Sequence, residues 1–339
     1  MSSRHALLFI YYFLPRPSEF SSRFPIFLPM KRVLILLAML PAAAQAQLSW
    51  QRSAAHSEGL PAGMQVFETK DSLDGKPFRA FYLEFDPADP QIETVVRSGN
   101  GKRLTPAQYD SLEGPSVLAV INTTFFSFQT NRSLNVVVQN GKVIDVNPKS
   151  IPNPHRTIYT TRGAFGLSRR NRPDVAWVYN VGEKNTPYAY DVPVTPEING
   201  TDTVYRQPGK KYPRGAHRWK MKEAVGGGPV LVQDGRAHVT MSEERMGGVK
   251  DFHPRSAVGY RADGKVILLV VEGRNKGVAE GATLQQLADI FTSLQCVEAL
   301  NLDGGGSSAL YVNHLNTIKP SDAAGQRPVP AVLVIRRKG

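Results

Sequence analysis

The chain has 339 residues, 41 Lys and Arg against 29 Asp and Glu, and a formal net charge of +12. Its single cysteine, Cys296, excludes a disulfide within the chain and a cysteine-based zinc site. The basic residues form no long block. The charge therefore predicts an anionic ligand or surface and no nucleic-acid partner, although solubility alone would also account for it.

Residues 1–46 are predicted to be a start region and a cleaved signal peptide. A basic pair, Lys31-Arg32, precedes an apolar run over 33–40 and small residues suited to cleavage at 44–46. The run is too short for a bilayer, which takes about 20 apolar residues. We therefore expect Met30 to be the true start and the mature chain to begin near Gln47. The protein would then be periplasmic or secreted, with no stable membrane span.

After a polar lead-in over 47–64, a single domain is expected over 65–339. Asn140-Gly141, Asp234-Gly235 and Asp263-Gly264 are dipeptides typical of hairpin turns. The polar segment 181–222 is expected to be an insertion or a lid over the site. Apolar or alternating runs predict strands over 78–85, 92–97, 117–121, 134–138, 164–167, 174–178, 229–232, 257–260, 266–271, 297–302 and 332–335.

One helix is predicted to begin after Thr283, a suitable N-cap residue. Leu287, Ile290, Phe291 and Leu294 recur at helical spacing beyond it. Many hairpins with one long helix predict an α+β fold, with a mixed, hairpin-rich β-sheet core and few helices.

Four segments contain candidate site residues. The first is a strand end, and the second is a glycine run. Asn122 ends an apolar strand beside Phe125 and Phe126, which would form a sugar platform or simply be buried in a turn. Gly227 and Gly228 precede another strand. Their N–H groups could approach an anion closely, although a glycine-rich bulge without a ligand is an equal alternative.

The third segment brings charged residues to two neighbouring apolar runs. Arg255 and Arg274 have planar guanidinium groups that match phosphate. Glu272 lies at a strand end, a suitable place for a reacting carboxylate. His253 would supply a proton or cap a turn. Each of these residues alone is more often a solvated surface charge.

The fourth and sharpest segment is Asp303-Gly304-Gly305-Gly306-Ser307-Ser308, directly after an apolar run. The glycines leave room beside the carboxylate, while amides and hydroxyls can line an anion pocket; a tight turn without a ligand is the alternative. The segment lacks the lysine of a P-loop. It also lacks the Asp-then-His order of a serine hydrolase, since only His314 and then Asp322 follow.

Taken together, these motifs resemble the phosphodiester glycosidase family, which includes a lysosomal uncovering enzyme and many exported bacterial proteins. The resemblance covers about residues 65–337. It departs from the family at Thr123-Thr124, where a small residue is usual, and at Glu272, where Asp is frequent. The matching segments are Asn122–Phe126, Gly226–Pro229, Arg255–Gly259, Glu272–Arg274, Gly281–Leu284, Asn301–Ser307 and Arg327–Ile335.

The resemblance implies hydrolysis of the bond between a sugar anomeric carbon and a phosphodiester, in envelope or exopolysaccharide metabolism. Asp303 would act as the catalytic carboxylate, with Glu272 second. The phosphate would be held by Arg255, Arg274 and the amides of 304–306. Asn122 and Ser307 would bond to sugar hydroxyls or phosphate oxygens.

Three other classes remain open from the sequence. The protein could be a glycosidase for neutral α-linked sugars or a non-catalytic polysaccharide-binding protein of the envelope. It could also be an enzyme with a divalent cation on the oxygens of Asp303 and Glu272, although the sequence requires no cofactor.

Overall fold

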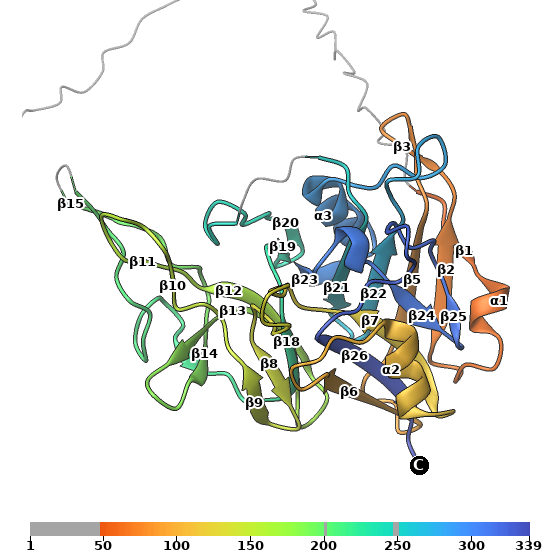
Figure 1. Ribbon diagram of the computed structural model, residues 1–339, viewed down its shortest axis with the longest axis horizontal. Coiled ribbons are helices and arrows are strands. Elements are labelled where there is room, and N and C mark those ends of the chain that lie inside the picture. The colour runs from red at the N-terminus through yellow and green to blue at the C-terminus, as the bar shows by residue number, and fades with distance from the viewer. Residues whose placement is uncertain (1–47, 200–201, 247–250) are drawn as a thin grey trace, which may run out of the picture. The chain divides into compact units, whose positions relative to one another are not determined.

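Three large antiparallel sheets contain most of the strands of the described chain (Figure 1). The computed structural model describes residues 48–199, 202–246 and 251–339, which belong to one compact unit. The predicted signal peptide lies outside these residues. Within them, no helix has the length and apolar character needed to cross a membrane.

The eight-stranded sheet has the order β1-β2-β5-β22-β21-β23-β19-β20. Its first strand belongs to the predicted lead-in, which therefore forms part of the sheet and continues into the short helix α1 (Ala54–Ser57). The strands are β1 (Gln51–Arg52), β2 (Gln65–Thr69), β5 (Ala80–Phe85), β22 (Val266–Val271), β21 (Arg255–Arg261), β23 (Cys296–Asn301), β19 (Val230–Gln233) and β20 (Arg236–Ala237).

The other two large sheets have seven and five strands. The seven-stranded sheet contains β17 (His217–Arg218), β14 (Thr186–Tyr190), β13 (Pro173–Val181), β12 (Arg162–Ser168), β18 (Met221–Gly226), β8 (Val137–Gln139) and β9 (Lys142–Asp145), in that order. The five-stranded sheet contains β25 (Leu315–Asn316), β24 (Leu310–Val312), β7 (Val117–Asn122), β26 (Ala331–Arg337) and β6 (Ile92–Ser98).

Three small hairpins complete the strands described. They are β3 (Ser72–Leu73) with β4 (Lys76–Pro77), β10 (Ser150–Ile151) with β11 (Ile158–Tyr159), and β15 (Glu197–Asn199) with β16 (Asp202–Val204). The segment 181–222 thus contributes strands to the seven-stranded sheet, since β14 pairs with β13 and β17. Its β15–β16 hairpin extends at the left of Figure 1. The lid role of this segment stays a prediction.

The α+β, hairpin-rich fold with few helices is confirmed, and the sheets, expected to be mixed, are antiparallel at every described strand pair. The dipeptides Asn140-Gly141 and Asp234-Gly235 have positive φ at both residues, as their turns require. In Asp263-Gly264 only the glycine does, with φ 88°. That turn therefore needs left-handed backbone at one residue instead of two.

The main core lies on one face of β22, whose apolar run is buried on both faces. Leu268 and Val270 pack into the main core, while Ile267 and Leu269 pack on the opposite face, against the side covered by α3 (Leu284–Ser293). Because successive residues of a strand point to opposite faces, a central strand covered on both sides is apolar at every position.

Helix α3 begins as the sequence predicts and packs on β21 at a glycine. Thr283 Oγ1 accepts from Gln286 N–H (3.1 Å), and Gln286 Oε1 accepts from Thr283 N–H (2.9 Å). A Cβ on Gly259 would lie 2.7 Å from the Phe291 ring. The missing side chain therefore lets the helix approach the sheet closely.

A second helix, α2 (Pro106–Glu113), was not predicted. It has the same reciprocal cap, with Gln108 N–H donating to Thr105 Oγ1 (3.1 Å) and Thr105 N–H to Gln108 Oε1 (2.8 Å). Tyr109 is its only buried large hydrophobic residue. The helix therefore has a clear start signal but little apolar periodicity.

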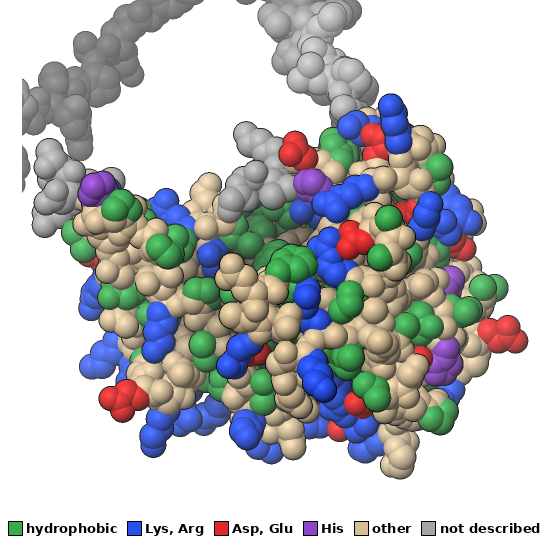
Figure 2. Space-filling model, viewed as in Figure 1, with side chains coloured by type: hydrophobic (Ala, Val, Ile, Leu, Met, Phe, Trp, Pro, Cys, Tyr) green, Lys and Arg blue, Asp and Glu red, His purple; other side chains and the backbone are tan. Residues whose placement is uncertain are grey.

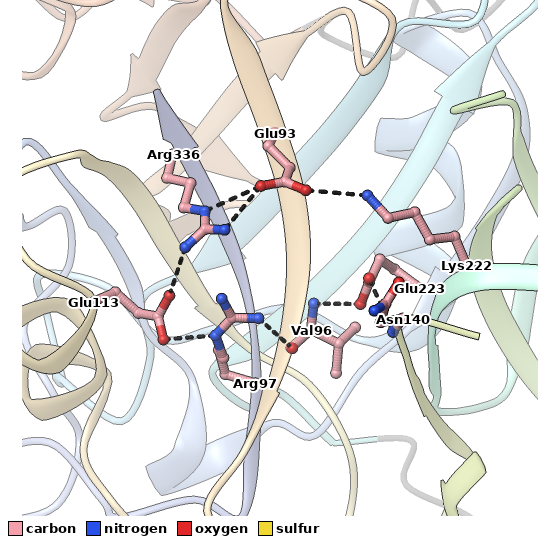
Figure 3. Close-up of polar contacts among 8 residues, drawn as sticks. All are labelled: Glu93, Val96, Arg97, Glu113, Asn140, Lys222, Glu223 and Arg336. Carbon is pink, nitrogen blue, oxygen red and sulfur yellow. Dashed lines mark hydrogen bonds and ion pairs between the residues drawn. The ribbon is translucent and has the colours of Figure 1, made fainter. Parts of the chain in front are cut away.

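A buried carboxylate joins the seven-stranded sheet to the five-stranded sheet (Figure 3). Glu223 in β18 accepts from Val96 N–H in β6 (2.8 Å) and from Asn140 N–H in the β8–β9 turn (3.0 Å). Half-exposed ion pairs surround it, including Lys222 Nζ with Glu93 (3.1 Å). Such pairs contribute little individually, so the buried carboxylate is the stronger tie between the sheets.

A second buried carboxylate, Glu244, joins the seven-stranded sheet to the eight-stranded sheet. It is 0% exposed and accepts from Gly163 N–H (2.8 Å) in β12 and Val230 N–H (2.8 Å) in β19. Thr240 Oγ1 (2.7 Å) and Trp177 Nε1 (3.2 Å) also donate to it. Both carboxylate oxygens are therefore occupied by donors.

We expect Glu244→Gln to lower the free energy of unfolding by about 1–3 kcal/mol, because the new amide NH₂ faces a buried donor. Denaturant unfolding measures this change. Exposed Glu183 provides the control, since Glu183→Gln removes the same charge without a buried contact. Equal midpoints for Glu244→Gln and wild type would contradict the proposed tie.

Candidate functional site

Segments that are distant in sequence meet at the end of β23. Beyond Asn301, Leu302 N–H donates to the Ser256 carbonyl (2.8 Å) at the start of β21. Asp303 N–H donates to the Thr123 carbonyl (2.8 Å) just after β7. The ends of strands from two sheets thereby hold the backbone of the aspartate on both sides.

Asn122 positions the loop that begins at Asp303. It is 0% exposed, and its Oδ1 accepts from Ser256 Oγ (2.6 Å) and Ala309 N–H (3.1 Å). Its Nδ2 donates to the Asp303 carbonyl (2.6 Å). These bonds occupy both ends of the amide, so the structure gives Asn122 a positioning role. The sugar contact predicted for it stays a prediction.

The Asp303 carboxyl has a pKa suited to proton exchange near neutrality. Burial raises its pKa from 3.8 to about 7, against the opposing effects of the Ser307 hydroxyl, the Arg327 guanidinium and the Gly304 N–H. Both the acid and the carboxylate are consequently populated at neutral pH. This is the behaviour of a group that takes or gives a proton during a reaction.

Two arginines pack against the glycines that follow Asp303. Arg274 Nη2 lies 3.0 Å from the position that a Cβ on Gly305 would occupy, and Arg327 lies against Gly306. Arg327 was not predicted as a site residue from the sequence. Its Nε (2.7 Å) and Nη2 (2.9 Å) donate to the two carboxylate oxygens of Asp322. Side chains at the two glycines would displace these cations from the loop.

Arg255 is the first residue of β21, and His253 lies in the segment just before that strand. Arg255 is buried, donates to the carbonyls of Ala282 (2.9 Å) and Asp251 (3.1 Å), and has a pKa lowered to about 10 by burial and by Arg274. It therefore remains charged at neutral pH. Burial and the two arginines lower the pKa of His253, which favours its neutral form.

Several buried polar atoms around this loop have no hydrogen-bond partner within the described part of the chain. They are Thr124 Oγ1, His253 Nδ1, Asn301 Oδ1, Ser307 Oγ and Ser308 Oγ. The Ser307 hydroxyl faces the Asp303 carboxyl without a hydrogen bond of ordinary geometry. Buried polar groups are nearly always bonded, so a cluster of exceptions beside one loop indicates a ligand site.

Glu272, by contrast, is held by protein groups on both oxygens. It accepts from Asn275 Nδ2 (3.0 Å) and Lys319 N–H (3.2 Å), and Arg79 Nη1 lies 3.6 Å away. Glu272 therefore links the end of β22 to the segment around Lys319. Its catalytic role stays a prediction. Across the described ranges, no three His, Cys, Asp or Glu side chains come together as metal ligands.

The glycine run before β19 is used for backbone packing. Gly227 N–H donates to the Gly163 carbonyl (2.9 Å), and Gly228 N–H donates to the Asn301 carbonyl (2.8 Å). A Cβ on Gly227 would also collide with Asn301. These amides are therefore engaged within the protein, and the anion contact predicted for Gly227 and Gly228 stays a prediction.

The aromatic residues after Asn122 divide between the core and the surface. Phe126 is buried, 9% exposed, whereas Phe128 is 63% exposed. Arg103 lies 5.1 Å and Arg327 5.7 Å from the centre of the Phe128 ring. The exposed aromatic face near Arg327 is therefore at Phe128, two positions beyond the aromatic pair named from the sequence.

The site combines a carboxyl whose pKa lies near neutrality with several nearby arginines, on an antiparallel, hairpin-rich fold. Residues 115–336 match the family model described as phosphodiester glycosidase. The chain belongs to the phosphodiester glycosidase family.

Relatives found by sequence align over short segments. The bovine N-acetylglucosamine-1-phosphodiester alpha-N-acetylglucosaminidase is 29% identical over 99 residues, 28% of this chain and 18% of that protein. The SPbeta prophage-derived uncharacterized protein YomE of Bacillus subtilis is 38% identical over 69 residues, 19% of this chain and 11% of that protein. The aligned segment thus spans less than a fifth of either relative.

Solved structures share the fold over most of the chain. The zebrafish N-acetylglucosamine-1-phosphodiester alpha-N-acetylglucosaminidase catalytic domain, auto-inhibited by its pro-peptide, has a TM-score of 0.56 at 18% identity. That match covers 86% of this chain and 89% of the other. A putative exported protein from Burkholderia pseudomallei has a TM-score of 0.54 at 15% identity, with 79% and 75% covered.

The raised pKa of Asp303 predicts a pH-dependent stability. The folded state holds the proton up to about pH 7, whereas the unfolded state releases it near 3.8, so stability from this group is lost as pH rises between those values. Asp303→Asn removes the effect. We expect the variant to gain stability relative to wild type between pH 4 and 7, by up to roughly 4 kcal/mol.

Denaturant unfolding of both proteins at a series of pH values measures this difference. Asp234→Asn is the matched control, because Asp234 is exposed and its φ of 50° suits asparagine. A constant difference between wild type and Asp303→Asn across the range would contradict the raised pKa.

Proposed function

We propose that this protein is an exported glycosidase that hydrolyses the bond between a sugar anomeric carbon and a phosphodiester. The observation that carries the proposal is the pKa of Asp303, which is raised to about 7. The glycine loop that follows Asp303 packs against Arg274 and Arg327. Family membership supports a glycosidase-type reaction. Export rests on the signal-like sequence over 30–46.

Asp303 acts in its ionised form. The carboxylate takes a proton from water as the water oxygen bonds to the anomeric carbon. The bond from that carbon to the bridging phosphate oxygen breaks, and its electron pair leaves with the phosphate. The products are the free sugar and a phosphomonoester, and the proton passes from Asp303 to the solvent.

The arginines stabilise the leaving group. A phosphomonoester carries more negative charge than the diester from which it forms, so nearby cations bind the transition state more tightly than the substrate. Arg274 and Arg327 lie against the loop, and buried Arg255 adds a further positive charge. This arrangement favours a phosphate leaving group over the neutral alcohol of an ordinary glycoside.

Asp303→Asn is expected to reduce kcat at least 10³-fold, because the amide cannot accept a proton from water. Release of free sugar from a panel of sugar 1-phosphodiesters measures the loss, with Asp234→Asn as the folded control. A fully active Asp303→Asn protein would exclude the assignment. Turnover of a neutral aryl glycoside alone would instead identify a glycosidase for neutral sugars.

The pH dependence of kcat tests the role of the carboxylate. Because the ionised form is active, kcat should rise with pH through about 7, and a fall over that range would identify Asp303 as an acid instead. Arg327→Gln removes a charge that lowers the pKa of Asp303, so the midpoint should move to higher pH. Arg52→Gln, at an exposed position in β1, should leave the midpoint unchanged.

A further inference from the structure

A basic cavity lies on the seven-stranded sheet and shares no lining residue with the Asp303 site. Its volume is about 600 Å³. Among the described residues that line it there is no Asp or Glu. The charged ones are Arg169, Arg170, Arg172, Arg218 and Lys220. Figure 2 shows several Lys and Arg side chains at the lower left, over the region where Figure 1 places β9 and β14.

The β12–β13 turn presents three of these arginines in a defined arrangement. Asn171 has φ 55°, and Ser168 Oγ accepts from the N–H groups of Arg170 (3.3 Å) and Arg172 (3.1 Å). Arg169 Nη2 lies 3.4 Å from the position of a Cβ on Gly141. Its guanidinium therefore reaches the β8–β9 turn, which also lines the cavity.

Further lining residues come from β17 and from the segment before β18. Arg218 pairs with Tyr188 in β14, and Trp219 is buried beneath the cavity at 4% exposure. Trp219 Nε1 donates to a carboxylate oxygen of Asp174 (2.5 Å), which fixes the orientation of the indole. The cavity thus has an ordered aromatic floor and basic walls.

The five cations make no ion pair with a carboxylate in the part of the chain that the structure describes. Neighbouring basic residues do so, as Lys222 with Glu93 and Arg132 with Asp145 show. Like charges around one cavity repel each other and raise its positive potential. An anionic ligand relieves this repulsion, and guanidinium groups match phosphate oxygens in pairs.

We propose that this cavity binds a flexible linear polymer that carries several phosphate groups. Its volume exceeds what one phosphate needs and falls within the range of ordinary ligand sites. Cations from the β12–β13 turn and from the segment around β17 line the same cavity and can contact successive phosphates of one strand. Binding here is independent of hydrolysis at Asp303, so the two can be tested separately.

The test measures binding of fluorescent inorganic polyphosphate to the Asp303→Asn protein at several salt concentrations. We expect binding that weakens steeply with salt, because counterions are released. The double variant Arg169→Gln, Arg172→Gln should bind at least 10-fold more weakly and with a shallower salt dependence. The matched control Arg52→Gln, Lys338→Gln removes the same charge at exposed positions and should change affinity less than 2-fold.

Three results would overturn the proposal. Equal weakening in both double variants would assign binding to net charge instead of the cavity. If orthophosphate displaced the polyphosphate completely at an equal concentration of phosphate groups, the cavity would be a site for a single phosphate. Equally tight binding of duplex DNA or anionic vesicles, lost in the cavity variant, would exclude a flexible polymer as the preferred ligand. Circular dichroism of the turn variants confirms that their fold is intact.

Discussion

The buried amide of Asn122 is the constraint on which the site depends. Its Oδ1 accepts from Ser256 in the eight-stranded sheet, and its Nδ2 donates to the Asp303 carbonyl. One side chain at the end of β7 therefore joins two sheets and the loop that bears the carboxyl. Because Asn122 is fully buried, water cannot replace its hydrogen bonds. Their loss would leave several polar groups unpaired. The glycines of that loop supply no side chains of their own to hold it.

Two buried glutamates extend the same principle to the rest of the fold. Glu244 joins the seven-stranded to the eight-stranded sheet, and Glu223 joins it to the five-stranded sheet. Each accepts backbone N–H groups that would otherwise be buried without a partner. Burial raises the pKa of both carboxyls. The sheets are therefore positioned by specific polar contacts as well as by the apolar core between them.

The sequence predicted elements where local pattern and tertiary environment agree. The apolar run of β22, the Thr283 cap and the Asn140-Gly141 turn each carry their own signal, and each is confirmed. Helix α2 was missed because its eight residues have little apolar periodicity, although Thr105-Pro-Ala-Gln is a capping box. Asn122 and Asp303 were found as candidates, but the burial of Asn122 follows from chain segments far away in sequence. Arg327 begins a segment that resembles the family, but only the fold brings it to Gly306.

Two opposing effects set the pKa of Asp303, and burial is the larger of them. Burial favours the neutral acid at Asp303, while Arg327 and the hydroxyl of Ser307 favour the carboxylate. Arg327 is itself paired with Asp322, which reduces the positive charge that acts on Asp303. An unpaired arginine in contact with the carboxyl would hold it ionised and make it a weak base. The Asp322 pair therefore allows one loop to combine cations for a phosphate with a carboxyl that still exchanges its proton near neutral pH.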